Sequence, residues 1–480
     1  MYPMSITERY LFKMIQPISL YQLADVSKGA SMGENIEFSS VAIDTRTLNQ
    51  GDLYIALKGE YFDGHQFIGK AVTKGCCGFV INNDADYIDE ELEMTPYVTV
   101  DNTLKVLGDC SRINRENFQG KVIGLTGSSG KTSTKNMLES ILTEVGSTCA
   151  TQGNFNNEVG VPLTLLSINE KHKFAVVEMG ARKKGDIKYL NDFVQPDVAI
   201  LLNAGTAHID IFGSQEDIVL TKGEIFSSLK IGGRAVVNID DPAHQIWLDS
   251  LEGKDILTFS MDIKTANIYA SNIESNDIST NFILNFMGNS QQVFLPVPGL
   301  HNVANSLAAF AAAIHLGFDL ATIANGLSKL NASNGRLMTI PCSELLVVID
   351  DSYNANPNSM CAAIDVLSLK QGFKIAVLGE MAELGDFSKK LHVELANYVA
   401  HSNVDKVYLI GTFSVEMAEI IGERAQAART KSEVFESLKN KEEIFKTDVN
   451  RLVATSILIK GSRSTKMDEL VEMIVKEATH

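Results

Sequence analysis

The chain has 480 residues, of which 45% are hydrophobic, and this length suffices for about three globular domains. A formal net charge of −17 at pH 7 argues against nucleic acid as the main partner, because neutralising phosphates requires clustered Lys and Arg. The six cysteines show neither a C-x-x-C pair nor zinc-type spacing, and no signal peptide or long apolar run is found, so we expect a cytoplasmic protein with reduced thiols and no membrane insertion.

The chain divides into three regions of different texture. Residues 1–120 mix short strand-like runs with turn residues, whereas residues 121–332 and 333–480 each alternate near-continuous apolar runs with helical patterns. Apolar runs without alternation are typical of strands buried on both faces of a parallel sheet. We therefore expect an α/β fold with three domains: a small mixed N-terminal domain, a central P-loop domain built on a parallel sheet, and a Rossmann-like C-terminal domain.

The run GLTGSSGKTST at residues 124–134 follows the strand-like KVIGL and precedes a helical pattern. Glycines there let backbone N–H groups approach phosphate oxygens, Lys131 can reach the β and γ phosphates, and Thr132 can ligate Mg²⁺. The general P-loop pattern requires Gly where Leu125 stands, so a Gly/Ser-rich turn with a surface lysine is the alternative. The candidate nucleotide-binding residues of the loop are Gly127, Ser128, Ser129, Gly130, Lys131, Thr132 and Ser133.

Two further apolar runs end in side chains suited to a metal. Glu178 ends FAVVE, and His208 ends the segment NAGTAH after the next strand. An unpaired Glu is costly to bury, and a neutral imidazole can ligate a metal. Because the carboxyl ends of parallel strands meet at one edge of a sheet, we expect both near the loop. The alternatives are a Glu that emerges into solvent and a structural histidine.

Two further segments give weaker evidence for a binding site. QEDIVLTKG predicts a helix capped by Ser214, in which spacing alone favours a solvated Lys222. GLHNVANSLAA predicts a helix with Asn302 and Asn305 in one polar patch, which could contact adenine or serve local capping.

The segment VVIDDSYNANP, with Asp351 and Tyr353, follows a buried strand and suggests a ligand-binding edge. Arg336 lies where the second region meets the third. An arginine there could reach a phosphate when the two domains close.

Taken in order, nine segments of the chain resemble the Mur ligase family, the ATP-dependent amide-forming enzymes of peptidoglycan precursor synthesis. The short G-x-x-G-K-T loop of that family also accounts for Leu125. The segments are DTRTLNQGDLYIALKGEYFDGHQF, GSSGKTS, GNFNNEVGVPLTLL, EMGARKKGDI, AHIDIFGSQEDIVLTKGEIF, GLHNVANSLAA, DDSYNANPNSM, LGEMAELG and KGSRSTKM.

The resemblance implies a role for each matching residue. Lys131 and Thr132 hold ATP and Mg²⁺, and Glu178 and His208 resemble the ligands of two Mg²⁺ ions. Lys222 matches a lysine that is carbamylated in the family and would then join the metal ligands. The implied nucleotide contacts are Asn302, Asn305, Arg336, Asp351 and Tyr353, and the implied catalytic set is Lys131, His208, Lys222 and Arg336.

The resemblance also implies substrate-binding residues. Six lie in segments similar to those that hold the uridine nucleotide: Thr45, Arg46, Lys58, Asp63, Gly64 and His65. Asn156 and Asn157 lie in another matching segment, and Ser462 and Arg463 match a motif near the incoming dipeptide.

The implied reaction joins D-alanyl-D-alanine to UDP-N-acetylmuramoyl-tripeptide through an acyl phosphate, and we expect a monomer. The N-terminal domain would bind the uridine nucleotide, the central domain ATP, and the C-terminal domain the dipeptide. A diamino-acid-adding Mur ligase is disfavoured because no D-N-P-R motif is present, and a folylpolyglutamate synthetase because it would not need FDGHQF. The remaining alternatives are a P-loop ATPase or switch and an inactive binder of nucleotide sugars.

Overall fold

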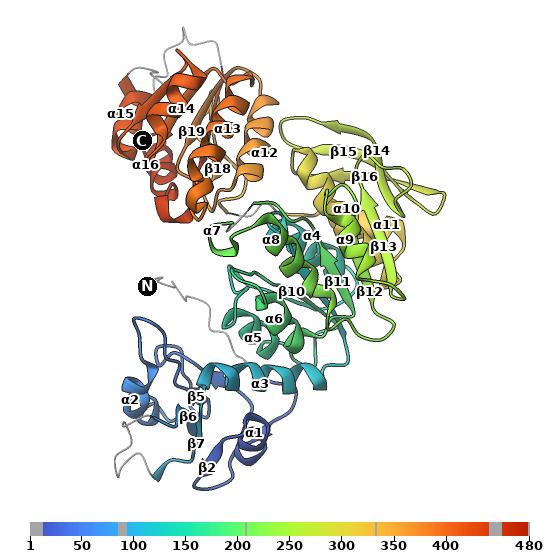
Figure 1. Cartoon of the computed structure of the whole chain (residues 1–480), viewed down its shortest axis with the longest axis vertical. Coiled ribbons are helices and arrows are strands. Elements are labelled where there is room, and N and C mark those ends of the chain that lie inside the picture. The colour runs from blue at the N-terminus through green and yellow to red at the C-terminus, as the bar shows by residue number, and fades with distance from the viewer. Residues whose placement is uncertain (1–12, 85–93, 207–208, 332–333, 441–453, 479–480) are drawn as a thin grey trace.

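The computed structural model describes residues 13–84, 94–206, 209–331, 334–440 and 454–478, and these form an elongated molecule of three parts (Figure 1). The N-terminal part lies at one end, the central part in the middle and the C-terminal part at the other end (Figure 1). Each of the three large sheets draws all its strands from one of the three regions expected from the sequence.

The N-terminal part is built on a five-stranded sheet with the order β2-β7-β6-β5-β4. Only β2 is antiparallel to its neighbour, and a separate two-stranded sheet pairs β1 with β3. Its elements are β1 (Ile18–Ser19), α1 (Leu20–Ser27), β2 (Ala30–Met32), β3 (Glu37–Phe38), β4 (Val41–Ala42), β5 (Leu53–Ile55), η1 (Gly64–Phe67), α2 (Ile68–Thr73), β6 (Gly78–Asn82), β7 (Tyr97–Val100) and α3 (Thr103–Asn117).

The central part is built on a nine-stranded sheet with the order β16-β15-β14-β13-β12-β11-β8-β10-β9. The strands from β9 to β14 in this order are parallel, and fully buried β10 and β11 account for their unbroken apolar sequences. Its first elements are β8 (Lys121–Thr126), α4 (Lys131–Thr143), β9 (Thr148–Ala150), α5 (Gly160–Leu166), β10 (Phe174–Glu178), α6 (Asp186–Val194), β11 (Val198–Leu201), α7 (Ile209–Phe212), α8 (Gln215–Gly223) and η3 (Glu224–Phe226).

An antiparallel extension at one edge of this sheet was not predicted from the sequence. Strands β14, β15 and β16 pair antiparallel, and β15 alternates buried and half-buried residues, as expected of a sheet with one face on the core. The remaining elements of the central part are β12 (Arg234–Asn238), α9 (His244–Asp249), β13 (Asp255–Ser260), β14 (Ile268–Ser275), β15 (Thr280–Phe286), β16 (Asn289–Leu295), α10 (Leu300–His315) and α11 (Leu320–Ser328).

The C-terminal part is a six-stranded sheet with the order β17-β18-β22-β19-β20-β21, parallel except for β17 at the edge. Helices lie on both faces, as in a Rossmann-like domain (Figure 1). Its elements are β17 (Met338–Pro341), β18 (Leu346–Asp351), α12 (Pro357–Ser368), β19 (Phe373–Leu378), η4 (Gly385–Phe387), α13 (Ser388–Ala400), β20 (Lys406–Ile410), α14 (Ser414–Ile421), β21 (Ala425–Ala428), α15 (Lys431–Asn440), β22 (Thr455–Lys460), η5 (Arg463–Thr465) and α16 (Asp468–Ala478).

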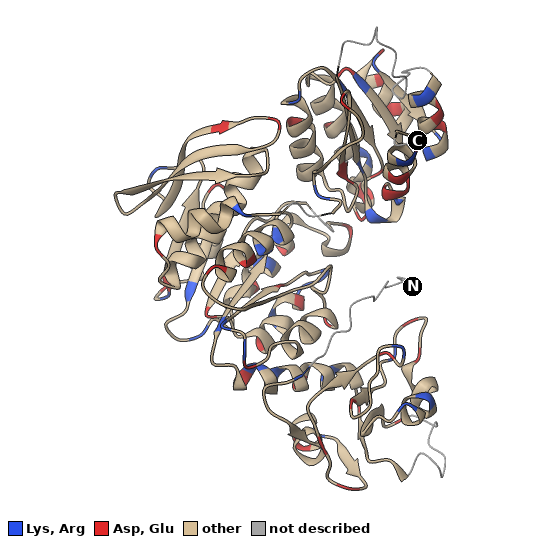
Figure 2. Ribbon diagram, turned by 180° about the vertical axis from the view of Figure 1, so that it is seen from behind, with Lys and Arg blue, Asp and Glu red and all other residues tan. Residues whose placement is uncertain are grey.

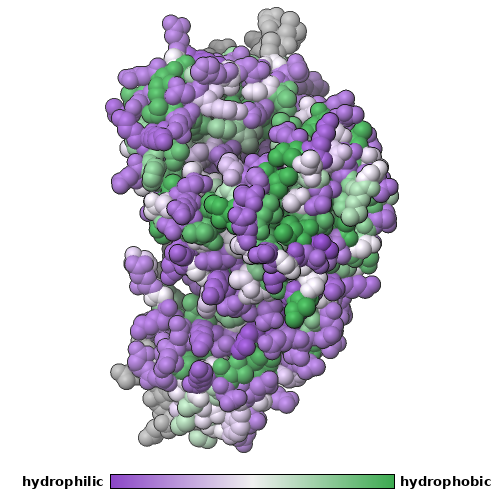
Figure 3. All heavy atoms as spheres, turned by 45° about the vertical axis from the view of Figure 1, so that its right-hand side comes forward, coloured by the Kyte–Doolittle hydropathy of each residue, from purple (hydrophilic) through white to green (hydrophobic). Residues whose placement is uncertain are grey.

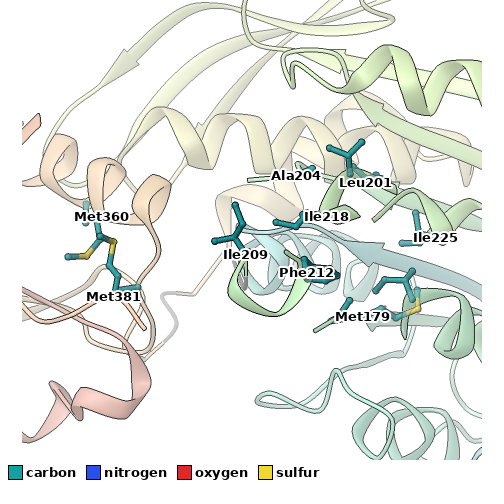
Figure 4. Packing of buried hydrophobic residues seen from close by; sticks show 14 of the residues in the cluster. Met179, Leu201, Ala204, Ile209, Phe212, Ile218, Ile225, Met360 and Met381 are labelled. Atoms are coloured by element: carbon teal, nitrogen blue, oxygen red, sulfur yellow. The ribbon is translucent and has the colours of Figure 1, made fainter. Parts of the chain in front are cut away.

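Buried contacts join the three parts. Helix α3 packs on α5 and α6, and Arg115 near its end donates to the carbonyls of Val194 and Gln195. One apolar cluster spans the central and C-terminal parts; Figure 4 shows Ile209 and Phe212 on the side that faces Met381. The face of the molecule seen in Figure 3 is mainly hydrophilic with apolar patches. No helix among the described residues is long and apolar enough to cross a membrane.

Candidate active site

A single large cavity has walls from all three parts of the molecule. Its lining includes the loop between β8 and α4, the end of β10, the start of α10 and the ends of β18 and β22. Thirteen Lys and Arg line it against nine Asp and Glu, although the chain as a whole carries a charge of −17. Both signs of charge occur on every part of the molecule (Figure 2), so this local excess of cations favours an anionic ligand.

The loop from Gly127 to Gly130 connects β8 to the first turn of α4, as predicted. Gly130 has φ of 79°, a left-handed conformation that favours glycine. The Lys131 Nζ donates to the Gly127 carbonyl at 2.7 Å, and burial lowers the pKa of this lysine. The glycine-rich loop and the N-terminus of α4, with Lys131 folded back onto the loop, thus form a cradle that suits a polyphosphate.

Asn203, which sequence analysis passed over, holds this loop in shape. Its Oδ1 accepts from the backbone N–H of Ser128 at 3.1 Å and of Ser129 at 3.0 Å. Its Nδ2 donates to the Ser129 carbonyl at 3.2 Å. The signal that could have found it is its position, since it is a polar residue just after β11, the strand beside β8 in the sheet.

Glu178 is buried beside the loop, with 2% of its surface exposed. Its carboxylate accepts from the Thr132 hydroxyl at 2.8 Å and from the Asn156 amide at 2.7 Å, and neither donor is charged. A buried carboxylate with uncharged donors favours a nearby cation. The described residues contain no group of three or more His, Cys, Asp or Glu that could hold a metal, and His208 lies outside the described residues.

Lys222 lies near the end of α8, whose cap is Ser214 as predicted. The expectation of a solvated lysine from spacing alone is wrong: only 2% of its surface is exposed. Burial, with a contribution from the Lys131 charge, lowers the pKa of Lys222 from 10.5 to about 7. Sequence spacing could not reveal this, because the burial depends on the packing of α8 against other elements of the central part, among them α6, α7 and η3.

The two asparagines of α10 are both buried and line the cavity. Asn305 lies against the loop: a Cβ added at Gly130 would come within 2.3 Å of its Oδ1. Asn302 donates its side-chain amide to the Pro298 carbonyl at 2.8 Å. Asn305 therefore explains why Gly130 tolerates no side chain, and Asn302 makes the local bond that the alternative reading expected.

Arg336 is held on the C-terminal part by its neighbours. Gly335 and Leu337 have φ of 68° and 54°, and the Gly335 carbonyl accepts from the Tyr353 N–H at 3.1 Å. The Arg336 guanidinium lies over the Tyr353 ring, 4.3 Å from its centroid. The Leu337 N–H donates to Asp351 at 3.2 Å. Predicted Arg336, Asp351 and Tyr353 thus form one connected unit that faces the cavity.

Lys460 is a second residue that sequence analysis missed. It lies opposite Asp351 in the β18–β22 register, and its Nζ is 2.6 Å from the Asp351 carboxylate and 2.9 Å from the Asn354 carbonyl. Burial raises the pKa of Asp351, and the Lys460 ammonium opposes this rise. Burial together with the Lys460 charge lowers the pKa of His301 to about 4, so this histidine is neutral.

The residues predicted for the uridine nucleotide separate into two groups. Thr45 and Arg46 line the cavity, and the Arg46 guanidinium contacts Asp44 at 2.6 Å. The other four do not line it. Asp63 accepts from the His65 N–H at 3.0 Å and contacts His65 Nδ1 at 2.6 Å, while His65 Nε2 accepts from the Asn82 N–H at 3.0 Å.

Lys58 and Gly64 belong to the same turn. The backbones of Lys58 and Asp63 pair in an isolated antiparallel β-bridge, and the Gly64 N–H donates to the Leu57 carbonyl. The four residues therefore make contacts that stabilise the turn, and none of them lines the cavity.

The last three predicted substrate residues line the cavity and make local contacts. Asn157 Oδ1 accepts from the Gly160 N–H at 2.9 Å, at the start of α5. Ser462 Oγ accepts from the Ala382 N–H at 2.7 Å, and Arg463 contacts Asp468 at 2.8 Å.

Family models match three consecutive segments of the chain. They are described as Mur ligase family, catalytic domain, at residues 37–114; Mur ligase middle domain, at residues 125–313; and Mur ligase, glutamate ligase domain, at residues 335–463. Together they include most of the residues that line the cavity.

Whole-chain similarity leads to the same family. The UDP-N-acetylmuramoyl-tripeptide–D-alanyl-D-alanine ligase of Escherichia coli is 36% identical, over 96% of this chain and 99% of that protein. A UDP-N-acetylmuramoylalanyl-D-glutamyl-2,6-diaminopimelate–D-alanyl-D-alanyl ligase from Acinetobacter baumannii is 35% identical with a TM-score of 0.84, covering 96% and 99% of the two chains. A MurF ligase from Thermotoga maritima in complex with ADP is 29% identical with a TM-score of 0.79, covering 92% and 97%. The expected three-domain α/β fold and the family resemblance are thereby confirmed, and the chain belongs to the Mur ligase family of ATP-dependent ligases.

Proposed function

We propose that this chain joins D-alanyl-D-alanine to UDP-N-acetylmuramoyl-tripeptide and cleaves ATP to ADP and phosphate. The observation that carries the proposal is that one cavity holds the loop lysine Lys131, the buried Glu178 and Lys222, with walls from all three parts of the molecule. A nucleotide, a nucleotide-linked peptide and an amine can therefore meet there. The names of the Escherichia coli and Acinetobacter relatives support the choice of substrates.

The reaction begins when an oxygen of the tripeptide's terminal carboxylate attacks the γ-phosphorus of ATP and ADP leaves. The product is an acyl phosphate. The D-alanyl-D-alanine amine then attacks its carbonyl carbon, loses a proton, and the C–O bond to phosphate breaks. Lys131 would stabilise the charge on the transferred phosphoryl group, and the backbone N–H groups at the start of α4 would hold the neighbouring phosphates.

The residues beside the loop suit a magnesium ion. Thr132 and Glu178 offer a hydroxyl and a carboxylate oxygen, the donor type that Mg²⁺ prefers. Such an ion supplies charge neutralisation at the phosphate oxygens. His208 is proposed as a further ligand, as is a second ion. Because the pKa of Lys222 is lowered to about 7, a substantial fraction of its amine is uncharged near neutral pH, and the uncharged form is the one that adds CO₂ to give an anionic carbamate.

The C-terminal part is proposed to complete the nucleotide site. Arg336 stacks on Tyr353 at the junction of the central and C-terminal parts, and both line the cavity. Ser462 and Arg463 line the same cavity from the β22 end, where the dipeptide is proposed to bind. Closure of this part over the loop would keep water from the acyl phosphate.

The test is ADP formation measured with each substrate alone and with both together. The proposal predicts that ADP forms only when tripeptide and dipeptide are both present. One ADP should then form for each new peptide bond. Steady ADP formation with neither substrate would favour the alternative of a P-loop ATPase and overturn the proposal.

A further inference from the structure

Three consecutive cations follow β10 on the wall of the cavity. Arg182, Lys183 and Lys184 are all exposed, and all three line the cavity that contains the P-loop. Because Arg182 is only four residues after Glu178, their Cα atoms are at most about 14 Å apart. The segment therefore lies beside the proposed site of phosphoryl transfer.

The backbone of this segment is fixed while its side chains are left available. The N–H groups of Arg182 and Lys183 both donate to one oxygen of Asp186 at 2.9 Å, and the Gly185 N–H donates to Glu224 at 2.9 Å. The carboxylates of Asp186 and Glu224 thus accept hydrogen bonds from the backbone of the turn that precedes α6. The three cationic side chains form no hydrogen bond or ion pair with any residue that the structure describes.

Three other cations of the cavity differ in this respect. Arg46 contacts Asp44 at 2.6 Å, Lys460 contacts Asp351 at 2.6 Å, and Arg463 contacts Asp468 at 2.8 Å. A carboxylate of the protein contacts each of these three side chains. In a chain with a net charge of −17, three adjacent unpaired cations on a cavity wall suit an anionic part of the ligand.

We propose that Arg182, Lys183 and Lys184 bind carboxylates of the tripeptide other than the one that is activated. This inference rests on the proposed function, which places the terminal carboxylate of the peptide at the P-loop. A peptide with the glutamyl and 2,6-diaminopimelate residues named for the Acinetobacter ligase has two further carboxylates, one on each residue. Both belong to the residue that is activated or to the one before it, so either can lie on the adjacent wall.

The test compares two charge-matched variants. One carries Arg182→Gln, Lys183→Gln and Lys184→Gln. The control carries Lys171→Gln, Lys188→Gln and Lys254→Gln, three exposed lysines of the central part that do not line the cavity. The first variant is expected to raise KM for the UDP-tripeptide roughly tenfold or more, because charge-assisted hydrogen bonds are lost, with KM for ATP and for the dipeptide unchanged. The control is expected to keep all three constants.

Two altered substrates identify the carboxylate. If the three cations bind diaminopimelate, replacing it by lysine removes the KM difference between wild type and variant. If they bind the glutamyl carboxylate, amidation of that group removes it. A KM difference that survives both replacements, or that the control variant shares, overturns the proposal. Failure of the wild type to ligate any of these tripeptides would instead overturn the proposed function.

Discussion

The loop of residues 127–133 and the turn of residues 58–65 contrast in how they use the polar side chains that sequence analysis singled out. In the loop, Lys131 and Thr132 lie in the cavity beside buried Glu178. In the turn, Asp63 and His65 bond to each other and to Asn82, away from the cavity.

The contrast separates a motif whose backbone conformation itself forms the binding site from a motif whose polar side chains stabilise a turn. A phosphate cradle is itself a backbone conformation, so the sequence that forms it also forms the site. In the turn, the polar side chains instead form hydrogen bonds within the protein that stabilise the turn itself. We therefore expect substitutions in the loop to change catalysis and substitutions in the turn to change stability.

The largest effect is expected from Lys131→Ala. Because no other side chain of the loop is cationic, the ligation rate should fall by roughly a thousandfold or more. The thermal unfolding midpoint should change little, since burial already disfavours the charged form of this lysine. Near-normal ligation by a folded Lys131→Ala variant would refute the assignment of the loop.

Lys222→Ala is expected to lose most activity, and short carboxylates such as formate or acetate should partly restore it. Intact activity in this variant, without any effect of added carboxylate, would remove Lys222 from the mechanism.

The pH dependence of Lys222 follows from its pKa of about 7. Below pH 7 the amine is protonated and cannot add CO₂, so carbamylation, read from the ¹³C NMR signal with labelled CO₂, should fall there. Between pH 7 and 10.5 the unfolded chain binds the proton and the folded chain does not, so this lysine makes the free energy of unfolding rise with pH. A carbamate signal independent of pH would contradict the low pKa.

Lys460→Met tests a residue outside the loop that holds a nucleotide contact in place. Removing the ammonium leaves the buried Asp351 carboxylate without its ion-pair partner, so KM for ATP should rise roughly tenfold, with KM for the dipeptide less affected. If Lys460 acts through Asp351, adding Asp351→Asn should cost little more.

The matched control is Lys374→Met. Lys374 lies on β19 of the same sheet, contacts Asp405 at 3.8 Å and does not line the cavity. Equal effects of the two lysine substitutions on KM for ATP would show that Lys460 contributes only to folding.

The smallest catalytic effect is expected in the turn. His65→Ala should lower the free energy of unfolding by about 1–3 kcal/mol, because the Asn82 N–H and Asp63 lose their partner. Urea denaturation measures this loss. Arg46→Gln, on the cavity wall, should instead raise KM for the UDP-linked substrate a few-fold with unchanged stability. The reverse pattern would break the contrast between loop and turn.

Much of this arrangement could be predicted from the sequence. Apolar runs that end in polar residues located β8, β10, β11, β18 and β22, and the glycines located the loop. What could not be predicted depends on packing between elements. The burial of Lys222 depends on the packing of α8 against α6, α7 and η3, and the Lys460–Asp351 pair comes from the alignment of strands more than a hundred residues apart. Unbroken apolar runs could not locate the antiparallel strands β14–β16, because more buried and less buried residues alternate along them.

The central claim is that ATP held by the loop activates the tripeptide carboxylate as an acyl phosphate, from which the new peptide bond forms. It is tested most directly with tripeptide whose terminal carboxylate carries ¹⁸O at both oxygens, followed by mass analysis of the phosphate released during ligation. An acyl phosphate transfers one carboxylate oxygen to phosphate, so the account predicts one ¹⁸O in each phosphate formed. Unlabelled phosphate would mean that another oxygen attacks ATP, and it would contradict the proposed reaction.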